Sequence, residues 1–100
     1  MIKYIVPWKF KDSAHGNDRA TNLRLTKEKL ESLRGRIPGL LAIEVGIDYS
    51  ATPNSGDAVL YSEFASREAL AVYQAHPLHL AIVPFVGEAA SERRMVDYEV

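Results

Sequence analysis

The chain has 100 residues, of which 47% are hydrophobic and 25% charged, a composition typical of one globular domain and not of a disordered protein. Its formal net charge of -1, with Lys and Arg spread along the chain, argues against a nucleic-acid partner, because phosphate binding needs concentrated positive charge. The absence of cysteine excludes disulfides, thiolate nucleophiles and metal sites built on Cys. No signal-peptide pattern and no run of ~18 apolar residues occurs, so we expect a cytoplasmic protein without a membrane partner.

Residues 2–11 alternate in the way that predicts a β-strand with one fully apolar face. The opposite face carries lysines but is apolar in its middle, at Ile5 and Pro7. Because proline has no N–H to donate, we expect a bulge or an unpaired position near Pro7.

The polar, glycine-containing segment 12–18 predicts a loop. Apolar residues at three- and four-residue steps then predict a helix over 19–36. Thr26 is a good N-cap and indicates a restart of this helix after an irregular turn, while Gly35 is expected to end it.

Residues 41–49 show the clearest alternation in the chain and predict a second strand. A long loop with Pro, Asn and Gly is expected over 50–57, followed by a third strand over 58–65. This third strand again has apolar residues on both faces: Leu60 and Phe64 on one, Val59 and Tyr61 on the other.

Ser66 is the expected N-cap of the next helix. The helix should end at His76, because Pro77 disfavours helical geometry in the residue before it. Pro77 is itself a favoured first helical position, so a second helical piece is expected from there, kinked or divided at Pro84. A final strand is expected over 93–100.

The predicted order is strand, helix, strand, strand, helix, strand, which is the ferredoxin-like βαββαβ plait of the α+β class, here filling one domain. Right-handed crossovers place both helices on one face of a four-stranded antiparallel sheet. The second face is then left uncovered although it is apolar, so we expect a homodimer that packs sheet on sheet.

The segment Tyr73…His76-Pro77-Leu78-His79, the terminal Asp97-Tyr98-Glu99 and the opening Ile2-Lys3-Tyr4-Ile5-Val6 closely resemble the stress-responsive dimeric α/β-barrel (Dabb) family. This resemblance spans the whole chain. It implies a homodimeric barrel with a pocket on each protomer between sheet and helices.

The resemblance also suggests a reaction. One plant member of the family closes a linear polyketide by an aldol condensation without metal or cofactor, and its catalytic Tyr and His match Tyr73 and His79 by position in the motif. That cyclase has further histidines where Tyr4 and Ala58, or a neighbour of Ala58, stand here, so its substrate is not carried over.

In this hypothesis His79 takes a proton next to a carbonyl, and Tyr73 donates a hydrogen bond to the enolate that forms. The alternative is that both side chains pack and pin the helix break. The candidate ligand contacts are Tyr4, Trp8, His76 and Phe85, of which His76 also suits a capping role and Trp8 and Phe85 suit plain packing. His76 and His79 form a poor metal pair, so neither a metal nor a cofactor is expected.

Three functions remain open from the sequence. The chain is a cofactor-free enzyme of the aldol or cyclase type, a binding protein for a small apolar or carbonyl-containing molecule, or a dimeric stress protein with a structural role. A cavity that is open to solvent and reaches both Tyr73 and His79 distinguishes the first two from the third.

Overall fold

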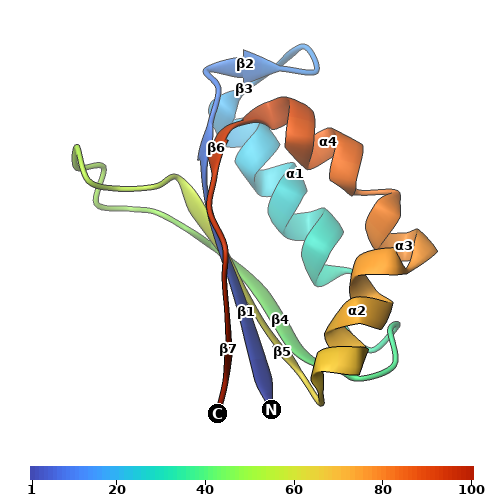
Figure 1. Ribbon diagram of the computed structural model, residues 1–100. Helices are drawn as coiled ribbons and strands as arrows, with labels where there is room; N and C mark the ends of the chain where they lie inside the picture. Colours follow the sequence, from blue (N-terminus) through green and yellow to red (C-terminus); the bar gives the residue numbers. More distant parts are fainter.

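The computed structural model describes all of residues 1–100 and shows a main antiparallel sheet with helices packed on one of its faces (Figure 1). The sheet has the strand order β4-β5-β1-β6, with β7 also pairing with β1. This is the predicted ferredoxin-like plait. In chain order the elements are β1 (Ile2–Phe10), β2 (Ser13–Ala14), β3 (Asn17–Asp18), α1 (Arg19–Glu31), β4 (Leu40–Ile47), β5 (Ala58–Phe64), α2 (Arg67–Ala75), α3 (Pro77–Leu80), α4 (Val83–Ala89), β6 (Ala90–Arg93) and β7 (Val96–Glu99).

Alternation along the two central strands separates the faces of the sheet. In β1 and β5 every second residue is buried under the helices, and the residues between them are only partly buried. The helix-covered face supplies much of the hydrophobic core, including Tyr4, Val6, Trp8, Leu60 and Phe64.

No element of the chain covers the other face, which we call the open face (Figure 1). Cross-strand pairing aligns Tyr61, Ile5 and Val96 in one row across it, and the next row contains Tyr98. Val96 and Tyr98 are exposed. The prediction of apolar side chains on both faces of the first and third strands is therefore confirmed.

The segment after β1 differs from the prediction. Residues 12–18 form the small β2–β3 hairpin in place of an irregular loop, because His15 and Gly16 both adopt positive φ, as a tight two-residue hairpin turn requires. The helix that follows is continuous and ends at Glu31, and the predicted restart at Thr26 is wrong. Thr26 is fully buried in mid-helix, facing the core.

The second strand ends at Ile47, earlier than expected, and the last strand begins at Ala90, also earlier than expected. A register shift between Leu40 and Ala42 turns Leu41 outward, and Tyr49 lies in the β4–β5 loop, almost fully exposed. The final strand is divided into β6 and β7. The break between β6 and β7 lies opposite Pro7 of β1. Proline has no N–H to donate, so one hydrogen bond between the strands is missing there. The bond that remains at Pro7 runs from the N–H of Arg94 to the Pro7 carbonyl.

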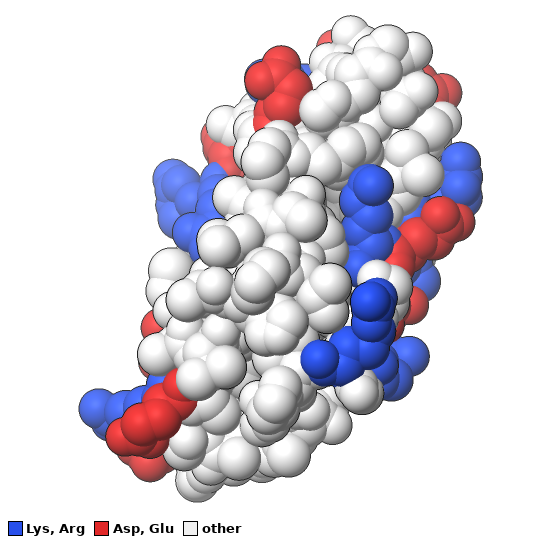
Figure 2. All heavy atoms as spheres, turned by 90° about the vertical axis from the view of Figure 1, so that its right-hand side faces the viewer, with Lys and Arg blue, Asp and Glu red and all other residues white.

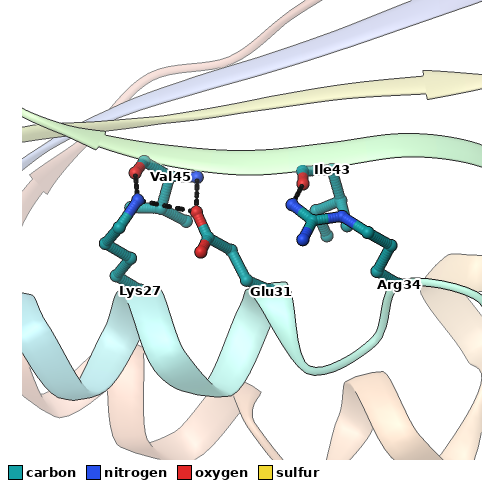
Figure 3. A network of polar contacts seen from close by, with 5 residues as sticks. All are labelled: Lys27, Glu31, Arg34, Ile43 and Val45. Carbon is teal, nitrogen blue, oxygen red and sulfur yellow. Dashed lines mark hydrogen bonds and ion pairs between the residues drawn. The ribbon is translucent and has the colours of Figure 1, made fainter.

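The outer edge of β4 is covered by side chains from α1 and the turn after it (Figure 3). Glu31 accepts a hydrogen bond from the backbone N–H of Val45 at 3.0 Å, and Lys27 donates to the carbonyl of the same residue at 2.6 Å. Arg34 donates to the carbonyl of Ile43. These bonds satisfy polar backbone groups that an edge strand otherwise leaves free.

No single helix is long and apolar enough to cross a bilayer; only the bent run formed by α2 with α3 and α4 has the necessary length and composition.

Candidate functional site

The site is built around the break between α2 and α3. His76 has an extended backbone (φ -70°, ψ 135°) and Pro77 follows at the first position of α3, so the helical run bends by 52°. The Nδ1 atom of His76 accepts a hydrogen bond from the backbone N–H of Leu78 at 3.1 Å, which caps α3. This bend brings Tyr73, on the last turn of α2, next to His79 on α3, with ring centroids 4.4 Å apart.

Both rings line a cavity of about 550 Å³ between the helices and the helix-covered face of β1, β5 and β6. Of its 17 lining residues 11 are hydrophobic, so the cavity suits an organic molecule with an apolar body. The exposed residues Leu80 and Val83 lie at its margin, where it opens to solvent. Figure 2 views the molecule from the helix side, where uncharged side chains cover the middle and most charged ones lie nearer the margins.

Tyr73 has no exposed surface, and its ring packs on Phe64 at a centroid distance of 5.0 Å. Its hydroxyl has no hydrogen-bond partner within the protein. Burial raises the pKa of Tyr73, and the nearby phenol of Tyr4 raises it further. The hydroxyl therefore stays protonated near neutral pH and is free to donate.

His79 is half-buried, and its Nδ1 atom lies 3.3 Å from the carbonyl oxygen of Gln74. A carbonyl can only accept, so Nδ1 carries the proton and the Nε2 lone pair is left free. Burial lowers the pKa of His79 below its ordinary value, and the charge of Arg93 acts in the same direction against the opposing effect of the Gln74 carbonyl. The imidazole is therefore neutral at pH 7 and able to accept a proton.

Arg93 enters the cavity from β6. Its guanidinium Nη2 donates to the hydroxyl oxygen of Tyr4 at 2.8 Å. Trp8 lies opposite Arg93 in the β1–β6 pairing, so the two side chains are cross-strand neighbours. The indole Nε1 of Trp8 is buried and has no hydrogen-bond partner, like the hydroxyl of Tyr73.

A family model described as the stress responsive A/B barrel domain matches residues 2–100. The chain belongs to this family. No curated protein matches it. This Dabb chain is also similar to solved structures. A protein of Bacteroides fragilis, described as dimeric, of unknown function and with a ferredoxin-like fold, is 31% identical, with 99% of this chain and 95% of that one covered at a TM-score of 0.85.

Two further solved structures are similar to this chain. A Dabb family protein of Mesorhizobium loti with a ferredoxin-like fold is 24% identical, with 99% of this chain and 95% of that one covered and a TM-score of 0.72. A protein described as an antibiotic biosynthesis monooxygenase is 25% identical, with 100% and 98% covered and a TM-score of 0.78.

The structure places four of the six predicted site residues at the Dabb cavity: Tyr4, Trp8, Tyr73 and His79. Two lie elsewhere. His76 faces the following helix turn as its cap, and Phe85 stacks on His15 at 4.4 Å with the Lys29 ammonium over its ring. His15 is exposed, and its Nε2 atom also bonds to the carbonyl of Phe85.

Sequence reasoning missed Arg93 and the carbonyl of Gln74. Arg93 reads as one of several scattered surface charges, and only the pairing of its residue with Trp8 places it on the cavity side of the sheet. The Gln74 carbonyl is a backbone group, so no pattern of side chains in the sequence could predict its hydrogen bond to His79. No three His, Cys, Asp or Glu side chains are grouped so that they could hold a metal ion.

Proposed function

We propose that this Dabb protein is a dimer whose cavity binds a small carbonyl compound and removes a proton from it without a cofactor. One observation carries the proposal: Tyr73 and His79 meet at the same open cavity, one as an unused donor and the other with an unused acceptor. A proton transfer next to a carbonyl needs this pair of roles.

In the proposed reaction the Nε2 atom of His79 takes a proton from the carbon next to the substrate carbonyl. The electrons of the broken C–H bond move onto the carbonyl oxygen, where the hydroxyl of Tyr73 donates a hydrogen bond to the enolate. The enolate carbon then attacks a second carbonyl of the same molecule, which closes a ring. The new alkoxide takes the proton back from Nε2, so His79 ends neutral as it began.

A second candidate is a binding protein with the same cavity and no turnover. The largely apolar lining favours this candidate, and so does the contact between Tyr73 and His79, which is a ring contact at 38° and not a hydrogen bond. The similarity to a protein described as a monooxygenase supports a small-molecule ligand for this fold and leaves the reaction of this chain open.

Proton removal can be tested without the natural substrate. In D2O, the protein should speed the exchange of the α-protons of 1-phenyl-2-propanone for deuterium, which proton NMR follows directly. Replacing His79 by Gln should reduce the protein-dependent rate at least about tenfold, because a positioned base contributes roughly 10²–10⁴-fold. Tyr73→Phe should reduce it as well.

The matched control is His76→Gln, which removes the other histidine of the motif at the helix cap outside the cavity. It should keep the exchange rate of the unchanged protein. If unchanged protein and His79→Gln exchange the ketone equally while both bind it, the cavity is a binding site alone and the acid–base reaction is wrong.

The dimer is proposed from the open face. Its row of Tyr61, Ile5 and Val96 is apolar and uncovered, and solved structures of this fold are described as dimeric. Because α1 side chains cover the outer edge of β4, a second copy cannot simply extend the sheet there. Packing of two open faces against each other would bury this surface and close the two sheets into a barrel.

A further inference from the structure

The polar groups of the cavity are strongly one-sided. Trp8 offers an indole N–H, which can only donate, and Tyr73 offers a hydroxyl proton, and neither has a partner. Trp8 is 5% exposed and Tyr73 is 0% exposed, so water does not reach these groups from the surface of the free fold. Buried polar groups in proteins are almost always paired. Three buried side-chain groups of this chain are not, and two of them, Trp8 and Tyr73, line one cavity while the third, Thr26, does not; this clustering favours a missing acceptor in the cavity.

Arg93 adds a positive charge to these donors. It forms no ion pair with any carboxylate of the chain; the ion pairs of the structure involve other residues. Its bond to Tyr4 uses one of the five N–H groups of the guanidinium. The Tyr4 oxygen accepts in this bond, which leaves its own proton available for a ligand.

The one acidic residue at the cavity, Glu92, does not neutralise Arg93. Glu92 pairs with Lys9 in the β1–β6 ladder, whereas Arg93 pairs with Trp8. Successive side chains of a strand point to opposite faces, so the carboxylate of Glu92 belongs to the face away from the helices. The positive charge of Arg93 therefore stands unopposed on the cavity side.

We propose that the cavity selects ligands that carry a carboxylate, or another anionic oxygen, on an apolar body, with the anionic oxygen bound at Arg93 and Tyr4. The apolar lining takes the body. The donor atoms of Trp8 and Tyr73 have almost no exposed surface, so they reach a ligand oxygen only when side chains of the cavity wall shift on binding. This inference rests on the proposed function only in that the cavity is a ligand site; it does not need His79 to be a base.

Trp8 supplies a direct measurement, because it is the single tryptophan of the chain and lines the cavity. Its fluorescence is followed at pH 7 during titration with decanoate, decanamide and 1-decanol, which share one apolar chain and differ in the head group. Decanoate should bind about tenfold more tightly than the amide or the alcohol, since hydrogen bonds to charged groups are roughly twice as strong as neutral ones.

Two arginine variants locate the preference. Arg93→Gln should remove this preference, because it should weaken binding of decanoate by far more than binding of 1-decanol. Arg94→Gln is the matched control, because it removes the same charge from the next residue, whose guanidinium is exposed and bonds to the Arg93 backbone carbonyl. It should keep the preference for decanoate. Tyr4→Phe should weaken decanoate binding by less than Arg93→Gln does.

The affinities of the unchanged protein for the three ligands test the proposal even if a variant fails to fold. Equal affinity for all three ligands would show a cavity without acid selectivity, which overturns this inference and leaves the binding site intact. Loss of the preference in both arginine variants alike would assign it to general surface charge and also overturn the inference. If none of the three changes Trp8 fluorescence up to about 1 mM, the cavity does not select such acids and this inference is wrong, whereas the proposed function is decided separately by the deuterium-exchange experiment.

Discussion

The hydroxyl of Tyr73 and the indole N–H of Trp8 are buried without partners, although folding normally pairs such groups. An unpaired buried donor costs stability, because the group loses its hydrogen bonds to water and gains none in return. Both donors belong to the cavity. At the scale of single residues, these two unpaired donors therefore lower the stability of the fold at the positions where we propose that a ligand binds.

Tyr73→Phe should make the protein more stable while it weakens the proposed proton transfer. Removing an unpaired buried hydroxyl should raise the free energy of unfolding by about 1 kcal/mol, the lower end of its desolvation cost. Urea unfolding measures the change. Tyr4→Phe is the matched control and should not stabilise, because its hydroxyl is bonded to Arg93; equal stabilisation by both variants would contradict this explanation.

The pKa of His79 predicts a pH dependence of stability. This pKa is lowered in the folded protein, chiefly by burial. Below about pH 6.5 the unfolded chain therefore binds a proton at His79 that the folded chain does not yet bind. The stability that His79 contributes is complete above that pH and is lost as the pH falls through the folded-state pKa. Thermal unfolding from pH 8 to 5 should show a decline that is shallower in His79→Gln; identical slopes would contradict the shift.

At the scale of elements, the strand at the edge of the sheet depends on the helix beside it. The α1 helix closes the outer edge of β4 with Glu31, Lys27 and Arg34, which bond to its backbone (Figure 3). Burial alone would raise the pKa of Glu31, but Lys27 and the Val45 amide hold it below its usual value. The carboxylate therefore remains charged and continues to accept at neutral pH.

Glu31→Ala should lower the free energy of unfolding by about 1–2 kcal/mol, because it removes a charged hydrogen bond to the β4 backbone. It should also promote aggregation by opening the strand edge. Glu28→Ala is the control: Glu28 pairs only with Arg24, and both side chains are 59% exposed. Its loss should cost only a few tenths of a kcal/mol. Equal losses in urea unfolding would show that the edge contacts do not matter.

The elements with regular patterns were predictable and their ends were less so. Alternation fixed β1 and β5, and Pro77 fixed the helix break, because these features follow from backbone chemistry alone. The α1 helix ends at residue 31, five residues before its predicted end at 36. The glycine at position 35 adopts the positive φ of a turn, but a glycine alone does not determine at which preceding residue the helix stops. The division between β6 and β7 depends on the partner residue Pro7, which only the pairing reveals.

The same limit applies to the site. Tyr73, His79, Tyr4 and Trp8 could be chosen from side-chain chemistry and the family resemblance, and all four lie at one cavity. Arg93 could not be chosen in this way. Its place at the cavity is set by the pairing register of β1 with β6, which lie more than eighty residues apart in sequence. Phe85 was chosen for its aromatic ring, which the fold uses against His15 instead.

At the scale of the whole molecule, one face of the sheet holds the cavity and the other remains to be covered. Val96 lies on the open face, on the edge strand β7, and is 57% exposed, and Val72 on α2 is 50% exposed. Val96→Asp should therefore convert the proposed dimer to single chains of 11.1 kDa, whereas Val72→Asp should leave it intact. Light scattering after size exclusion measures both masses; a monomeric unchanged protein would contradict the barrel.

The most direct test of the whole account is a crystal structure of the protein soaked with decanoate. We expect a ligand in the cavity between sheet and helices, with an oxygen about 2.7–3.2 Å from the Arg93 guanidinium and the hydroxyl of Tyr73 donating to an acceptor. A cavity that is closed by protein side chains in the dimer, with Tyr73 and His79 bonded only to each other, would contradict it.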